Sequence, residues 1–251
     1  MSRHIIDCHA HSGPYFNFFV PRVSAEDMLA GMDNVGINIS CITPNMGLLN
    51  DITKGNQEML RIISEYRNRF KGYICINPNY PEHIKEDLDR YISNENVIGV
   101  KIHHTCHNTS IKNPSYDYAY SYINEKKGVI LFHTWDMETI SEIERVSKKY
   151  LDASIIMGHF GAYPDNMRYI ASLINDSEHL YGDNCLSITR EGNVEWLVSL
   201  VGSQKLLFGT DLPFFDPRPS IGRIINAILS ENDKDQILGL NMERIMKRIE
   251  K

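Results

Sequence analysis

Residues 5–13 read IIDCHAHSG, an apolar run that ends in two histidines, His9 and His11, with one residue between them. Short runs of apolar and β-branched residues are typical of buried strands. The chain holds 10 histidines, so one such pair can arise by chance. The neighbouring segments must therefore show which sheet this strand belongs to, and whether other strands end in the same way.

Segments like this one recur along the whole chain. The predicted strands are 4–9, 37–43, 70–76, 97–103, 129–133, 154–159, 179–188 and 205–211. Between and after them lie amphipathic segments with helical spacing, at 24–36, 56–70, 81–94, 115–127, 137–150, 164–175, 191–201, 218–230 and about 233–249. Ser24 is a typical N-cap residue and Gly36 a typical stop signal, which sets the limits of the first helix.

Strands that are apolar throughout and alternate with helices predict a parallel sheet covered on both faces. Eight such units in 251 residues match a closed (β/α)₈ TIM barrel, with residues 1–251 as a single domain. An open, doubly wound sheet is the alternative. No GxGxxG motif follows any predicted strand, which argues against it.

The composition limits the partners that we expect. The net charge of −6 argues against a nucleic-acid surface. The five scattered cysteines include no CxxC pair, the N-terminus resembles no signal peptide, and no apolar run is long enough to span a membrane. We expect a cytoplasmic protein that acts on a small molecule, with no nucleic-acid or membrane partner. Assembly into a homo-oligomer stays open.

In a barrel of this kind, functional residues gather at the C-terminal ends of the strands. Side chains alternate between the two faces of a strand. In the first strand this alternation predicts three polar residues pointing into the barrel: Asp7, His9 and His11. It also predicts that the residues between them face the helices: Ile6, Cys8 and Ala10.

Other strands end on polar residues as well. They are His133, His159 and Asp211, with Lys101 on the inner face of the fourth strand. Buried polar residues are costly unless they meet partners, and at one barrel mouth they can share a metal ion. Imidazoles and carboxylates are ligands for Zn²⁺ and similar divalent ions. We therefore predict a metal site built from the histidine pair, His133 and Asp211.

The motifs DCHAH, FHT, GHFG and FGTDLPF occur in this order on these strands. Together they resemble the amidohydrolase superfamily of metal-dependent barrel hydrolases, and most closely its amidohydrolase-related branch, which also contains nonoxidative decarboxylases. The resemblance covers nearly the whole chain and includes Asn241 in the tail segment QILGLNMERIMK. It implies that the metal ligands are His9, His11, His133 and Asp211. His159 would bind a second metal or polarise substrate and water.

The resemblance leaves the role of Lys101 open. Some members of the superfamily use a carboxylated lysine at this place to bridge two metals, whereas many one-metal members carry a lysine that is no ligand. Lys101 would otherwise be a free ammonium near the substrate or an ion-pair partner of Asp7. We expect one divalent ion, most simply Zn²⁺, or two if Lys101 is carboxylated.

Several residues are candidates for substrate contacts. Tyr15 and Phe16 lie in an aromatic loop after the first strand that would line a pocket, cover the barrel mouth or form a subunit contact. His103 follows the fourth strand and is a candidate to touch substrate. Arg190 and Arg218 follow the last two strands and would clamp a carboxylate or form surface ion pairs.

The leading hypothesis is a metal-dependent hydrolase that opens an amide, lactone or ester bond with a metal-activated water. Asp211 would be the catalytic base, because it is predicted to be the only carboxylate at a strand end facing the mouth apart from Asp7, which lies lower in the barrel. His159 would help to stabilise the oxyanion. A nonoxidative decarboxylase on the same scaffold is the alternative, and a non-catalytic metal-binding barrel is the third hypothesis.

Overall fold

The computed structural model describes residues 3–185 and 190–250. One parallel sheet runs in the order β1 to β8, which is the order of the strands in the chain. The strands are β1 (Ile5–Ser12), β2 (Ile37–Pro44), β3 (Phe70–Cys75), β4 (Val97–Ile102), β5 (Val129–His133), β6 (Ser154–Gly158), β7 (Leu180–Asp183) and β8 (Leu206–Leu207). The predicted (β/α)₈ barrel is confirmed.

Backbone hydrogen bonds close the barrel between its first and last strands. The Cys8 N–H donates to the Phe208 carbonyl over 2.9 Å, and the Asp211 N–H donates to the His9 carbonyl, also over 2.9 Å. The segment that follows β8 therefore lies beside β1. Closure removes the sheet edges and brings the ends of all eight strands to one rim.

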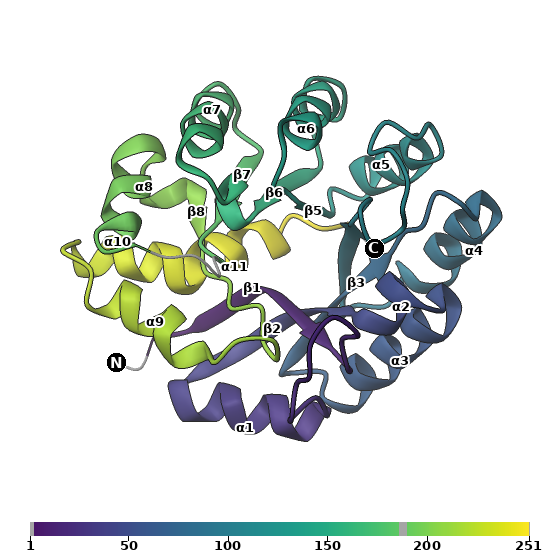
Figure 1. Cartoon of the computed structure of the whole chain (residues 1–251), viewed down its shortest axis with the longest axis horizontal. Coiled ribbons are helices and arrows are strands. Elements are labelled where there is room, and N and C mark those ends of the chain that lie inside the picture. The colour runs from purple at the N-terminus through teal and green to yellow at the C-terminus, as the bar shows by residue number, and fades with distance from the viewer. Residues whose placement is uncertain (1–2, 186–189, 251) are drawn as a thin grey trace.

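Helices surround this barrel (Figure 1). Those that cover the strands are α1 (Ala25–Val35), α3 (Ile52–Glu65), α4 (Pro81–Tyr91), α5 (Tyr116–Glu125), α6 (Met137–Lys149), α7 (Pro164–Asn175), α8 (Asn193–Val201) and α9 (Pro217–Ile225). Shorter pieces are α2 (Asn45–Leu49), α10 (Glu231–Asp235), α11 (Asn241–Met246) and the turns η1 (His159–Gly161), η2 (Ser203–Lys205) and η3 (Gln236–Leu240). None of the helices in the described ranges has an apolar stretch of the length that a bilayer requires.

The first helix begins and ends where its sequence predicts. The Ser24 hydroxyl accepts a hydrogen bond from the Asp27 N–H, and the Asp27 side chain accepts one from the Ser24 N–H, so the pair forms a capping box. Gly36 ends the helix in the left-handed conformation, with φ of 78°.

The C-terminal part of the chain differs from its prediction. The helix expected at about 233–249 is divided into α10, the π-helical turn η3 and α11. Hydrogen-bonded strand is also shorter than expected at β8 and at β7, and part of the predicted strand 179–188 lies outside the described residues. The side chain of Asn241, on α11, donates to the carbonyls of Ser203 and Leu206, which fixes this helix beneath β8.

The barrel interior has its own apolar cluster, separate from the larger layer between strands and helices. The Tyr73 hydroxyl donates across it, from β3 to the Cys8 carbonyl of β1. Ile6 and Cys8 belong to this inner cluster and Ala10 to the outer layer, so the prediction that Ile6 and Cys8 face the helices is wrong. The reason is a register irregularity of β1 against β2 between Asp7 and Ala10, which breaks the simple alternation.

Candidate metal centre

The two histidines of β1 meet Asp211 at the C-terminal mouth of the barrel. His9 is fully buried, and His11 and Asp211 are nearly so. One carboxylate oxygen of Asp211 lies 3.5 Å from His9 Nε2 and 3.4 Å from His11 Nε2. Asp211 itself has a φ of 59°, a conformation that non-glycine residues rarely adopt. The histidine pair and Asp211, which lie far apart in the sequence, are therefore close together in the structure, as their positions at strand ends predict.

His159 approaches the same carboxylate from the end of β6. Its Nδ1 lies 3.7 Å from the other oxygen of Asp211, and its Nε2 lies 3.2 Å from His133 Nδ1. His159 and Phe160 both have positive φ, 59° and 46°. The fully buried Phe160 ring packs so closely on Gly182 that a Cβ there would lie 2.1 Å from it. Packing therefore holds this strained turn and aims His159 at the centre.

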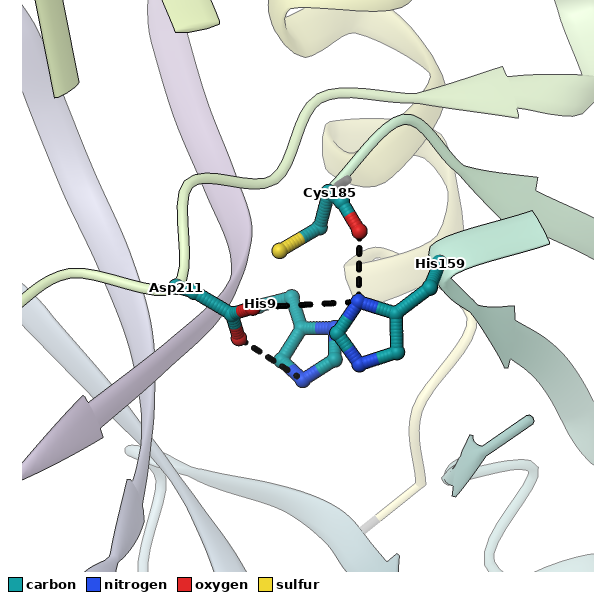
Figure 2. A group of neighbouring side chains, drawn as sticks. All are labelled: His9, His159, Cys185 and Asp211. Carbon is teal, nitrogen blue, oxygen red and sulfur yellow. Dashed lines mark hydrogen bonds and ion pairs between the residues drawn. The ribbon is translucent and has the colours of Figure 1, made fainter. Parts of the chain in front are cut away.

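Cys185 also belongs to this group. His9, His159, Cys185 and Asp211 each offer one ligand atom, and these atoms lie within 4.8 Å of one another (Figure 2). The Cys185 carbonyl is 2.5 Å from His159 Nδ1 and points at that ring (Figure 2). Burial raises the pKa of the Cys185 thiol well above its usual value. The Cys185 carbonyl orients His159.

Lys101 is fully buried behind His9. Its Nζ lies 2.7 Å from His9 Nε2, and burial lowers the pKa of the ammonium. The Asp7 carboxylate is engaged elsewhere, because it accepts hydrogen bonds from the Thr210 hydroxyl over 2.6 Å and from the Ser40 hydroxyl over 3.3 Å. The structure thus places Lys101 against a predicted metal ligand and not against Asp7.

One buried carboxylate of the centre is missing from the prediction. Asp183 ends β7, is fully buried, and lies 2.9 Å from His9 Nδ1 through its Oδ2. The expectation that Asp211 is the only strand-end carboxylate at the mouth is therefore wrong. The motif LYGD carries the same signal as the other strand ends, an apolar strand that stops on a polar residue. The predicted strand continues to residue 188, so Asp183 falls inside it and is not recognised as a strand end.

The protonation of these groups suits a divalent cation. Burial lowers the pKa of His9, His11 and His133, and that of His159 to about 4, so the imidazoles are neutral at pH 7. Burial alone would raise the pKa of Asp211, but the histidines around it outweigh this and hold the pKa well below its usual range. Neutral imidazoles around an ionised carboxylate are the donor set that Zn²⁺ and similar ions take.

A pocket of about 580 Å³ opens directly onto these residues. The polar side chains in its wall include His11, His103, His133, His159 and Asp211, and the aromatic ones include Tyr15, Phe16, Phe18, Trp135 and Phe214. The aromatic rings also stack on the histidines. Phe214 lies 4.5 Å from the His11 ring, and Trp135 lies 5.7 Å from the His133 ring.

Some of the residues predicted to contact substrate line the pocket, and others do not. His103 stacks on His133 with ring centroids 3.9 Å apart, and Tyr15 and Phe16 line the pocket, although 72% of Phe16 is exposed. Arg190 and Arg218 are exposed and are not brought to the pocket, and the Arg218 guanidinium pairs with Asp216. Among the described residues, no lysine or arginine lines the pocket.

Comparison with known proteins places this geometry in a family. The sequence profile of the amidohydrolase family matches residues 6–248. A search of curated proteins finds no match. Solved structures with the same fold include 5-carboxyvanillate decarboxylase LigW from Sphingomonas paucimobilis, at 13% identity and a TM-score of 0.77, covering 98% of this chain and 99% of that one.

Two further structures are similar to the same extent. 2,6-Dihydroxybenzoate decarboxylase from Rhizobium has 14% identity and a TM-score of 0.74, covering 98% of this chain and 99% of that one. 5-Carboxyvanillate decarboxylase from Novosphingobium aromaticivorans, complexed with manganese and a nitrobenzoic acid, has 15% identity and a TM-score of 0.79, covering 98% of this chain and 96% of that one. At such identities these likenesses show the fold, and the profile match shows the family. The chain belongs to the amidohydrolase family.

Proposed function

We propose that this protein is a metal-dependent nonoxidative decarboxylase of a flat, unsaturated carboxylic acid. The observation that carries the proposal is the pocket, in which the metal-ligand set opens onto aromatic walls. Such walls favour a planar substrate, because aromatic rings stack face to face or edge to face. The decarboxylases among the structural neighbours support this order of the two hypotheses. From the sequence alone, the hydrolase is the leading hypothesis and the decarboxylase the alternative.

The ion would be held by the residues that the motifs indicate. They are His9, His11, His133 and Asp211, with His159 beside them. We propose Mn²⁺ or Zn²⁺, since Mn²⁺ is bound by one neighbour and Zn²⁺ suits a site rich in imidazole. When bound, such an ion supplies positive charge that orients acidic substrate oxygens and stabilises negative charge in the transition state.

The reaction needs one proton at carbon. A C–H bond forms at the carbon that carries the carboxylate, the bond to the carboxylate breaks, and its electron pair returns to the unsaturated system as CO₂ leaves. Asp211 is ionised at rest and would take up that proton before passing it to carbon, since its carboxylate lines the pocket and lies within 3.7 Å of His159 Nδ1. Aromatic walls around the reacting carbon would favour proton transfer from a fixed group over transfer from bulk water.

Hydrolysis of an amide, lactone or ester is the second candidate, and one observation favours it. The pKa of Asp211 is held well below its usual range, so at pH 7 it is an ionised base ready to take a proton from water. His159, whose Nε2 faces the pocket wall beside His133, would then assist at the oxyanion.

A substrate panel separates the two reactions. The protein, loaded with Mn²⁺ or Zn²⁺, is incubated with hydroxylated benzoates and, separately, with small amides, lactones and esters. We expect CO₂ release together with loss of the carboxyl signal, and one deuteron in the product when the solvent is D₂O. Hydrolytic products without CO₂ would establish the second candidate. Bound metal with no turnover on either set would favour the non-catalytic barrel.

A further inference from the structure

Asp183 has no assigned part in the chemistry, yet it contacts two elements of the centre at once. We propose that Asp183 is a positioning residue that fixes the tautomer of His9 and holds the turn carrying His159. The inference rests on the metal centre of the proposed function and not on the reaction that it catalyses.

The first contact is to the ring of His9. Asp183 Oδ2 lies 2.9 Å from His9 Nδ1, and both side chains are fully buried. An ionised carboxylate only accepts hydrogen bonds, so His9 Nδ1 must carry the proton. The lone pair of the ring is then on Nε2, the atom that faces Lys101 Nζ at 2.7 Å and Asp211 at 3.5 Å.

The second contact is to the backbone on either side of the centre. Asp183 Oδ1 accepts hydrogen bonds from the N–H of His159 over 2.8 Å and from the N–H of Cys185 over 3.0 Å. His159 is the strained residue after β6, and Cys185 supplies the carbonyl at its Nδ1. One carboxylate therefore joins β1, β6 and the end of β7.

Gly209, which follows β8, lets the chain pass close to this group. A Cβ added to Gly209 would lie 2.8 Å from Cys185 Cβ, 3.1 Å from His9 Cβ and 3.6 Å from Asp183 Cγ. The approach to Cys185 Cβ is closer than a real Cβ atom allows, so this position requires glycine. Partners of this kind behind a ligating histidine typically change metal affinity by about 10- to 100-fold when they are removed.

The test is Asp183→Asn, which keeps the shape and replaces one acceptor oxygen by a donating NH₂ group. Its amide oxygen best accepts the two backbone N–H groups, which leaves the NH₂ group facing His9 Nδ1. His9 must then accept at Nδ1 and carry its proton on Nε2, where a metal needs the lone pair. We expect Zn²⁺ affinity, measured by chelator competition, to fall about 10- to 100-fold. A purely structural role would be rescued by this isosteric change.

A matched control is Asp87→Asn. Asp87 is a nearly buried carboxylate on α4 that accepts a hydrogen bond from Asn56, outside the centre. We expect this variant to bind Zn²⁺ as the unmodified chain does. Equal affinity loss in both variants, or unchanged affinity in Asp183→Asn, would overturn the proposal.

Nitrogen-15 NMR of the imidazoles provides a readout that needs neither metal nor substrate. In the metal-free, unmodified protein we expect His9 to be protonated at Nδ1, and in Asp183→Asn at Nε2. An Nε2–H signal from His9 in the unmodified protein would exclude the proposed role even if the variant did not fold. Because no substrate is involved, the outcome is independent of whether the enzyme proves to be a decarboxylase or a hydrolase.

Discussion

Two layers of the barrel interior lie on the same strands and differ completely in chemistry. The deeper layer, the floor, is the inner apolar cluster, which includes Leu131 of β5 and Tyr181 of β7. Two residues further along these strands, on the same face, lie His133 and Asp183. The floor stabilises the fold by burying apolar surface, whereas the mouth buries polar groups that cost free energy unless they meet partners. Stability and function are thus separated by depth in one barrel.

Residues with strained backbone conformations are concentrated at the mouth. Six non-glycine residues in the described chain have positive φ, and four of them are His159, Phe160, Ala162 and Asp211, at the mouth. Conformations of this kind cost roughly 1–3 kcal/mol each and persist where surrounding packing enforces them. The floor therefore supplies the stability that holds the mouth in a conformation suited to a metal.

The largest expected effect comes from removing the histidine pair. The double variant His9→Ala/His11→Ala should lose its bound divalent ion, because two of the ligands disappear. It should stay folded, since the floor beneath is untouched. Metal analysis beside circular dichroism measures both. His83→Ala, on the surface of α4, is the control. Full metal occupancy in the double variant would remove the histidine pair as ligands.

Asp211→Asn should have the next largest effect. Asparagine keeps the shape and can still offer an oxygen to a metal, but it cannot take up or deliver a proton. Loss of such a group typically costs about 10²–10⁴ in rate. We expect kcat to fall at least about 100-fold while most of the metal and substrate affinity remains, as steady-state kinetics and metal content will show. Near-normal kcat in the metal-loaded variant would transfer the proton role to His159.

A substitution in the floor should do the opposite. Leu131→Ala removes a fully buried side chain from the inner cluster and should lower the free energy of unfolding by about 2–5 kcal/mol. Metal content per folded chain should not change, since Leu131 lies in the floor cluster, two residues before His133 on β5. Urea unfolding and metal analysis check the two halves of this statement. Loss of metal from a variant that still folds would show that metal binding at the mouth also depends on the packing of the floor.

The same division explains what could be predicted from sequence. The barrel follows from a repeating pattern of eight strands and helices, and the ligand set from polar residues at strand ends such as His133 and Asp211. Both signals are local. Asp183 was hidden because the predicted strand ran past the point where β7 ends. The inward placement of Cys8 depends on a register irregularity, which arises from contacts between strands and leaves no periodic signal.

The arginines show a second limit of sequence reasoning. Arg190 and Arg218 follow strand ends, as functional residues of a barrel do, yet both are exposed away from the pocket. Asp216, two residues before Arg218, takes its guanidinium instead. A position after a strand predicts nearness to the mouth, whereas the direction of a long side chain depends on its local partners.

The last and smallest effect concerns a polar residue near the mouth that is no predicted ligand. His107, in the loop after β4, is 7% exposed, and neither ring nitrogen makes a hydrogen bond of good geometry within the described chain. Burial lowers its pKa to about 4 from 6.5. Between these values the unfolded chain takes up a proton that the folded chain does not, so this histidine makes stability fall as the pH falls from 6.5 towards 4.

His107→Leu removes that dependence of stability on pH. Relative to the unmodified protein, the variant should gain about 2 kcal/mol between pH 7 and pH 5, since each pKa unit corresponds to about 1.4 kcal/mol. Urea midpoints at the two pH values give this difference directly, and Asp7 and Asp183, whose burial raises their pKa values to about 7 and about 6, cancel because both proteins contain them. A stability difference that did not change with pH would mean that His107 is protonated as easily in the folded protein as in the unfolded chain, and that polar burial near the mouth carries no cost at this position.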